Sequence, residues 1–176
     1  MSGPAAPGRV LVAGIGNVFL GDDGFGVETA RALTARTPPA HVEVMDVGVR
    51  GVHLAYQLLD GYDTLILLDA TARGGAPGTL YVIEHEDTGA AGAPMDGHRM
   101  TPDAVLALLA TLCAGTGGRP PRRTLVVGCE PARVDEGMGL SEPVSAAVPE
   151  AVRIVEGLVE QSPEPGARPW TETVTP

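Results

Sequence analysis

The first apolar run of the chain, at residues 10–13, leads directly into a loop of glycines and acids. This loop reads Gly14-Ile-Gly-Asn-Val-Phe-Leu-Gly-Asp-Asp-Gly-Phe-Gly26. An apolar strand, a glycine-rich turn and a following helix are the unit from which α/β domains are built, and such turns bring backbone close to a ligand. Two carboxylates at the start of a helix repel phosphate and attract a cation. The loop therefore indicates an α/β protein whose site favours a metal over a nucleotide.

Short apolar runs bounded by turn residues alternate with segments of helical periodicity along the rest of the chain. This pattern predicts a three-layer α/β/α fold with a mixed, mostly parallel twisted sheet of about five strands. The third and fourth strands are joined by too few residues for a crossover helix, so we expect them to pair antiparallel. Asp22, or else Asp23, is expected to cap the first helix. The predicted strands are residues 9–14, 42–47, 64–69, 79–84 and 124–128, and the predicted helices are residues 24–36, 52–59, 101–113 and 144–160.

Length and composition limit the function classes. A chain of 176 residues with 44% hydrophobic residues predicts one domain over residues 1–161, followed by a Pro-rich tail at 162–176. A formal net charge of −10 argues against binding to nucleic acid. The twelve basic residues are all Arg, which excludes lysine chemistry. Cys113 and Cys129 are expected to be buried thiols, and the chain has no signal-peptide pattern or membrane-length apolar run, so we expect a cytoplasmic protein.

Three potential metal ligands fall where the carboxyl ends of parallel strands should meet. Asp23 follows the first strand, Asp69 ends the third, and His98 closes a loop predicted at residues 86–97. Two carboxylates and one imidazole suit a borderline divalent metal such as nickel or zinc. Taken singly, Asp23 could instead be a helix cap, and His98 could instead be a solvated loop residue. Asp69 is harder to explain otherwise, because a carboxylate that ends an apolar strand is costly unless it is paired or liganded.

Eight further sequence pieces form an ordered set. In order they are Gly16-Asn17, Asp22-Asp23-Gly24-Phe25-Gly26, Asp46, Leu68-Asp69-Ala70, Pro77-Gly78-Thr79, His98, Gly128-Cys-Glu-Pro131 and Gly139-Leu-Ser141. Through them the chain resembles the nickel-iron hydrogenase maturation endopeptidases from residue 10 to about residue 160. It departs from that family at Val47-Gly48-Val49, where a Gly-Gly-Thr turn is common, and at Asp96, where many relatives carry a serine.

The resemblance implies a function and a site. Family members remove a C-terminal extension from the large-subunit precursor of a nickel-iron hydrogenase after nickel insertion. The family's metal contacts fall here on Asp23, Asp69 and His98, so the same three residues are the catalytic and metal candidates. The implied cofactor is nickel, supplied by the precursor, and the implied partner is that precursor. The chain lacks serine, cysteine, threonine and His-Glu-x-x-His protease signatures, so hydrolysis is expected to be metal-assisted and to depend on carboxylates.

Two other functions remain open at this point. A non-catalytic assembly factor could sense nickel in the same precursor and bind it without cutting. A dinucleotide-binding module is suggested by Gly14-x-Gly16 and by Asp46 at the end of the second strand. The third glycine of that fingerprint falls on Phe19, however, and Asp22 and Asp23 would crowd a pyrophosphate.

Overall fold

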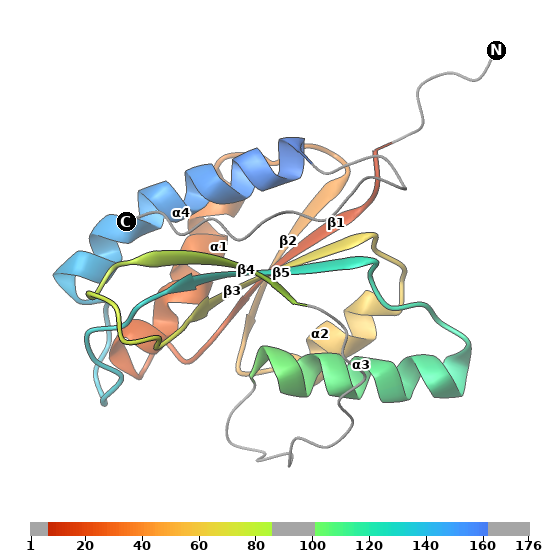
Figure 1. Cartoon of the computed structure of the whole chain (residues 1–176), viewed down its shortest axis with the longest axis horizontal. Helices are drawn as coiled ribbons and strands as arrows, with labels where there is room; N and C mark the ends of the chain where they lie inside the picture. The colour runs from red at the N-terminus through yellow and green to blue at the C-terminus, as the bar shows by residue number, and fades with distance from the viewer. Residues whose placement is uncertain (1–6, 86–100, 162–176) are drawn as a thin grey trace.

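The computed structural model describes residues 7–85 and 101–161 (Figure 1). Its five strands form one sheet in the order β2-β1-β3-β5-β4, in which β4 is antiparallel and the other pairings are parallel. The predicted mixed sheet is therefore confirmed. The elements are β1 Val10–Ile15, α1 Phe25–Ala35, β2 Val42–Gly48, α2 Gly51–Leu58, β3 Thr64–Ala70, β4 Leu80–His85, α3 Pro102–Thr116, β5 Arg123–Cys129 and α4 Glu142–Glu160, with a 3-10 turn at Gly21–Gly24.

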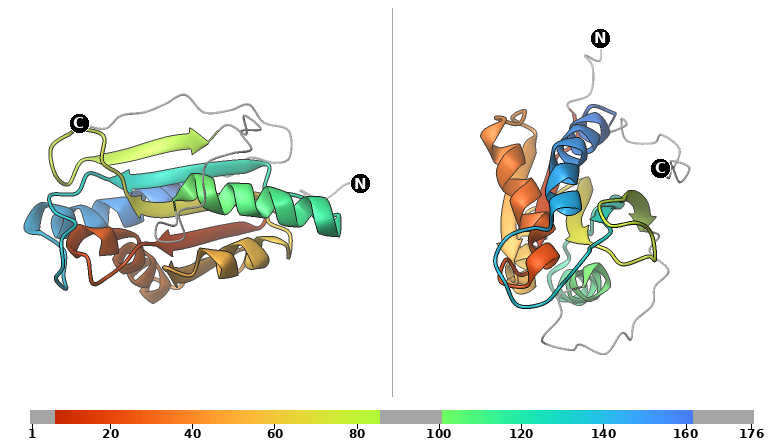
Figure 2. Two further views of the ribbon diagram at one scale, coloured as in Figure 1. Left: turned by 90° about the horizontal axis from the view of Figure 1, so that it is seen from below. Right: turned by 90° about the vertical axis from the view of Figure 1, so that its left-hand side faces the viewer.

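Helices cover both faces of the sheet, as the predicted three-layer fold requires (Figure 2). Helices α1 and α4 pack together on one face, where residues such as Phe25 and Val155 are buried against β1, β3 and β5. Helices α2 and α3 cover the other face, around Leu54 and Leu109. None of the helices within residues 7–85 and 101–161 is long and apolar enough to cross a membrane.

The predicted pairing of the third and fourth strands is wrong. Strand β5 lies between β3 and β4, parallel to the first and antiparallel to the second. A short connection fixes only the direction of the returning strand and does not fix its neighbour. Strand β5 is buried from Thr124 to Cys129, whereas β4 is only half-buried after Leu80. The strand with apolar side chains on both faces therefore takes the interior position, and the more polar strand takes the edge.

Each predicted helix and strand is present, with ends that differ by at most three residues from the prediction. The start of α3 is as expected, because the Thr101 hydroxyl accepts a hydrogen bond from the backbone N–H of Ala104 at 3.2 Å, and Pro102 is the first helical residue. The loop predicted at 86–97 and the tail predicted at 162–176 lie outside the described residues.

Helix α1 approaches the sheet closely enough to require glycine. A Cβ atom on Gly26 would lie 2.1 Å from the carbonyl oxygen of Leu68 and 2.4 Å from that of Ile15. These distances are far below van der Waals contact. The absence of a side chain at Gly26 is what lets the first turn of α1 rest on the ends of β1 and β3.

We expect Gly26→Ala to destabilise the fold by more than about 3 kcal/mol, because two backbone segments would have to separate. Gly157→Ala is the matched control, since Gly157 is also helical but its Cβ would have no neighbour within 4 Å. That control should be neutral or stabilising by about 0.5 to 1 kcal/mol. Urea unfolding of both variants measures the difference, and similar midpoints would contradict the close-approach argument.

Candidate functional site

The carboxyl ends of four parallel strands meet at one edge of the sheet, and the candidate site lies there. The loop after β1 carries Asp23, and Asp69 is the next-to-last residue of β3. Strands β1 and β3 are neighbours in the sheet, which brings the two acids to the same edge. Parallel α/β sheets bind ligands beyond this edge.

Asp69 is a half-buried acid whose carboxyl group is influenced by a second acid. It follows Leu67 and Leu68, which have no exposed surface. Desolvation of the carboxyl group and, to a smaller extent, the negative charge of Asp23 together raise the pKa of Asp69 to about 8, although a hydrogen bond from the backbone of Ala70 opposes them. The raised pKa favours the protonated form of the Asp69 carboxyl group at neutral pH.

Asp23 is held by the loop that precedes it. Its Oδ2 atom accepts a hydrogen bond from the backbone N–H of Asn17 at 2.8 Å. Gly16 lies against Asp23 with a φ of +131°, and a Cβ there would be 1.9 Å from the carbonyl oxygen of Asp23. The glycine loop is thus wrapped around this residue. Helix α1 takes its N-cap from Gly24 without a side-chain hydrogen bond, so Asp23 is not its cap.

The expected capping role of Asp22 is also wrong. Its carboxylate has no exposed surface and accepts hydrogen bonds from the backbone N–H groups of Ala132 (2.8 Å), Arg133 (3.0 Å) and Ser141 (2.7 Å), and from the Ser141 hydroxyl (2.8 Å). Burial would raise the pKa of Asp22, but these hydrogen bonds outweigh it and hold the pKa below its usual value. Asp22 therefore joins the loop after β1 to the loop after β5. Sequence spacing could not show this, because the partners are more than 100 residues away.

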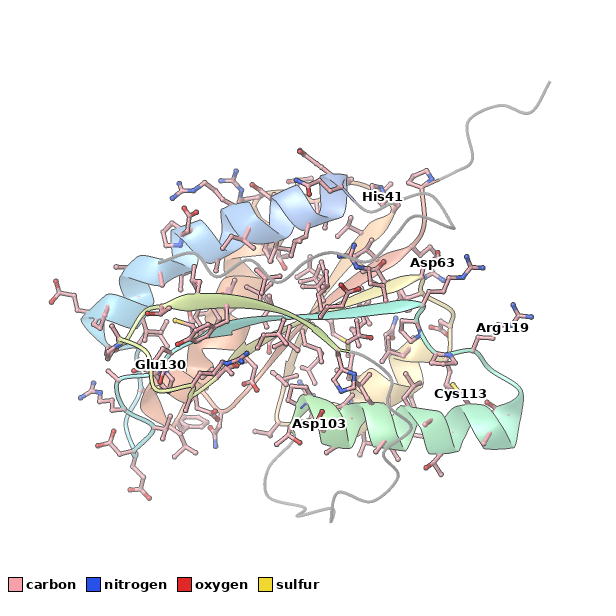
Figure 3. All side chains as sticks on the ribbon, viewed as in Figure 1. His41, Asp63, Asp103, Cys113, Arg119 and Glu130 are labelled. Carbon is pink, nitrogen blue, oxygen red and sulfur yellow. The ribbon has the colours of Figure 1, made fainter. Side chains whose placement is uncertain are left out.

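Glu130, which begins the loop after β5, joins that loop to the turn between β3 and β4 at the same edge (Figure 3). Its carboxylate accepts hydrogen bonds from the backbone N–H groups of Arg73 and Gly74 and from the Tyr81 hydroxyl, at 2.8, 3.2 and 2.8 Å. The bond from Arg73 is the main cause of its lowered pKa. Glu130 thus fixes the turn between β3 and β4.

His98 and Asp96 lie outside the described residues, so the structure brings together two of the three predicted ligands. Within the described part of the chain, no group of three His, Cys, Asp or Glu side chains could hold a metal ion. The Asp23–Asp69 pair is accordingly the described portion of the candidate site. It offers carboxylate oxygens to a cation, and a third ligand from elsewhere is needed to complete a set.

Both cysteines are buried free thiols, as predicted. Burial and, to a smaller extent, the negative charges of Asp22 and Glu130 together raise the pKa of Cys129 to about 12. Cys129 is therefore a neutral thiol at the end of β5, and a thiolate nucleophile at this position is disfavoured.

Comparison with known proteins gives one consistent family. A family model described as hydrogenase maturation protease matches residues 27–158. The hydrogenase expression/formation protein HoxM of Azotobacter vinelandii is 36% identical over 165 residues, which cover 91% of this chain and 77% of that protein. The hydrogenase 2 maturation protease of Escherichia coli is 31% identical over 157 residues, which cover 88% of this chain and 92% of that protein.

Solved structures agree with the sequence relatives. The hydrogenase maturating endopeptidase HybD from Escherichia coli superposes with a TM-score of 0.72 and 29% identity, covering 88% of this chain and 93% of that one. A hydrogenase 2 maturation peptidase from a Thaumarchaeota archaeon has a TM-score of 0.67 and 32% identity, covering 86% and 98%. The fold described above is therefore similar to that of solved maturation peptidases.

Proposed function

This chain belongs to the hydrogenase maturation protease family, and we propose that it removes the C-terminal extension from the nickel-loaded large-subunit precursor of a nickel-iron hydrogenase. The observation that carries the proposal is the pair of carboxylates, Asp23 and Asp69, held at the sheet edge of a peptidase fold. Family membership supplies the reaction class, peptide-bond hydrolysis, and the carboxylate pair supplies groups suited to it.

Nickel enters this proposal as part of the substrate. Asp23, Asp69 and His98 are the residues that would contact it, because carboxylate and imidazole ligands suit nickel and other borderline metals. The pair of acids fits a cation on its own chemistry. One of the two carboxyl groups has its pKa raised to about 8, and a cation that takes the place of its proton would offset the repulsion between the two carboxylates. A precursor without nickel would bring no such positive charge and would bind less well.

The residues of the chain then have two tasks in hydrolysis. Asp23 is fixed by the Asn17 N–H, so its carboxylate is oriented before the precursor arrives. A carboxylate of the pair takes the proton of the attacking water, as general bases do. The nickel of the substrate would supply a positive charge that attracts the carboxylates of Asp23 and Asp69 and so favours binding of the precursor near its scissile bond.

The direct test is incubation of the purified protein with nickel-loaded and nickel-free precursor, followed by intact mass measurement. We expect loss of a C-terminal peptide from the loaded form alone, with many precursors cut by each protein molecule. Stoichiometric binding without cutting would favour a non-catalytic assembly factor. Equal cutting of both forms would contradict the proposal that cleavage depends on nickel in the precursor.

A further inference from the structure

Asp22 is the least exposed acid at the sheet edge, and the proposed hydrolysis does not use it. Its four hydrogen bonds are all 3.0 Å or shorter, and they reach Ala132, Arg133 and Ser141. Ser141 is the N-cap residue of α4, and its own side chain makes no capping bond there. A carboxylate that accepts several N–H bonds at a helix N-terminus is strongly held.

Backbone hydrogen bonds join the same two loops around Asp22. The N–H of Asp22 donates to the carbonyl oxygen of Arg133 at 2.9 Å, and the N–H of Gly21 donates to that of Gly137 at 2.8 Å. The N–H of Gly137 donates back to the carbonyl oxygen of Phe19 at 2.9 Å. Residues 19–22 are therefore fixed from outside their own segment, by the loop that follows β5.

The turn that carries Asp23 depends on this external support. It is a single 3-10 turn, Gly21–Gly24, and it begins at a glycine with a φ of +55°. Turns this short gain little from their own hydrogen bonds. Asp22 and Asp23 are consecutive in it, so the atoms that anchor one residue also determine the direction of the next.

We propose that Asp22 is a positioning residue, which anchors the 3-10 turn on the loop after β5 and thereby holds the Asp23 carboxylate in place beside Asp69. This rests on the proposed function only in assigning a role in cleavage to Asp23. Asp22 itself is not proposed to contact substrate or metal. It affects activity by fixing the backbone of the turn, which sets the position of Asp23.

Hydrogen exchange tests the positioning without any substrate. The Asn17 amide reports on Asp23, because it donates to Asp23 Oδ2, whereas the Gly16 amide donates to the carbonyl oxygen of Gly48. In Asp22→Asn, an NH2 group replaces one acceptor oxygen and faces N–H donors. We expect the Asn17 amide to exchange at least ten-fold faster, with Gly16 little changed, and Ser141→Ala to give a smaller acceleration of the same amide.

Glu130→Gln is the matched control, because Glu130 also joins two segments at this edge through three hydrogen bonds, which go to Arg73, Gly74 and Tyr81 and not to Asp22 or Asp23. It should leave the Asn17 amide protected. Unchanged Asn17 exchange in Asp22→Asn, or an equal acceleration in Glu130→Gln, would overturn the inference. Should Asp22→Asn fail to fold, Ser141→Ala decides, and unchanged Asn17 exchange in that variant has the same meaning.

Cleavage kinetics give the second readout. With nickel-loaded precursor we expect Asp22→Asn to lower kcat/KM by about 10- to 100-fold per folded molecule, because a misplaced Asp23 would act less well both on the nickel of the precursor and in the chemical step. A wild-type kcat/KM in folded Asp22→Asn would refute the role. If the wild-type protein cut no precursor, the proposed function would fail, while the exchange experiment would still decide the positioning.

Discussion

Asp69→Asn is expected to make the folded protein more stable at pH 8 and to abolish cleavage of the precursor. The two effects have one cause, a half-buried carboxyl group that is desolvated and exposed to the negative charge of Asp23. Burial and the neighbouring charge raise its pKa from 3.8 to about 8. An asparagine of the same shape cannot ionise, so it removes the cost of the buried charge and also the ligand and proton acceptor.

The direction of the pH dependence of stability follows from the difference in bound protons between the folded and unfolded states. Between pH 4 and pH 8 the folded state keeps a proton on Asp69 that the unfolded state has lost, so the free energy of unfolding falls as pH rises through this window. At about 1.4 kcal/mol per pH unit, this costs the wild-type protein roughly 3 to 4 kcal/mol between pH 5 and pH 8. Asp69→Asn should lack this loss, and cleavage should fall by at least about 100-fold.

Urea unfolding at pH 5, 6.5 and 8 measures the stability part, and intact mass of the precursor measures the cleavage part. Asp135→Asn is a control for loss of one negative charge, since Asp135 lies at the same edge but is exposed. The control should follow the wild-type protein in both measurements. Equal pH dependence in the wild-type protein and Asp69→Asn would show that the Asp69 carboxyl group is ionised in the folded state.

The sequence was sufficient to predict the helices and strands, but it did not predict which strands lie next to each other in every part of the sheet. Apolar runs and the Thr101-Pro102 signal predicted the strands and the start of α3, because burial and capping are local properties. The neighbours of β4 depended on which strand is buried on both faces, a comparison between segments 40 residues apart. The prediction therefore gave the antiparallel direction of β4 correctly but assigned β3, in place of β5, as its neighbour.

In the candidate site, too, local features were predicted and contacts between distant segments were not. Asp23 and Asp69 were identified from their positions after or at the ends of strands, because parallel strands bring their carboxyl ends to one edge. It could not distinguish Asp22 from Asp23, since adjacent acids in a turn have the same local pattern. Only the donors on the loop after β5 show that Asp22 is a buried anchor, and the two acids also differ in that the charge of Asp23 contributes to the raised pKa of Asp69. His98 was predicted as the third ligand, and it stays a prediction.

Asp23→Asn is expected to lower cleavage of nickel-loaded precursor by at least about 100-fold, since it removes the charge that attracts the cation and a potential proton acceptor. The fold should survive, because the asparagine carbonyl oxygen can still accept the Asn17 N–H bond. The stability of this variant should also depend less on pH than that of the wild-type protein. The reason is that the Asp23 charge contributes to the raised pKa of Asp69, although burial contributes more.

Asp23→Asn and Asp22→Asn therefore separate chemistry from positioning, although the two residues are adjacent and the charge change is the same. Asp23→Asn should lose cleavage with normal protection of the Asn17 amide, whereas Asp22→Asn should lose both. Asp135→Asn should lose neither. Wild-type cleavage by a folded Asp23→Asn variant would remove this residue from the site and leave Asp69 to act with groups other than its acidic neighbour.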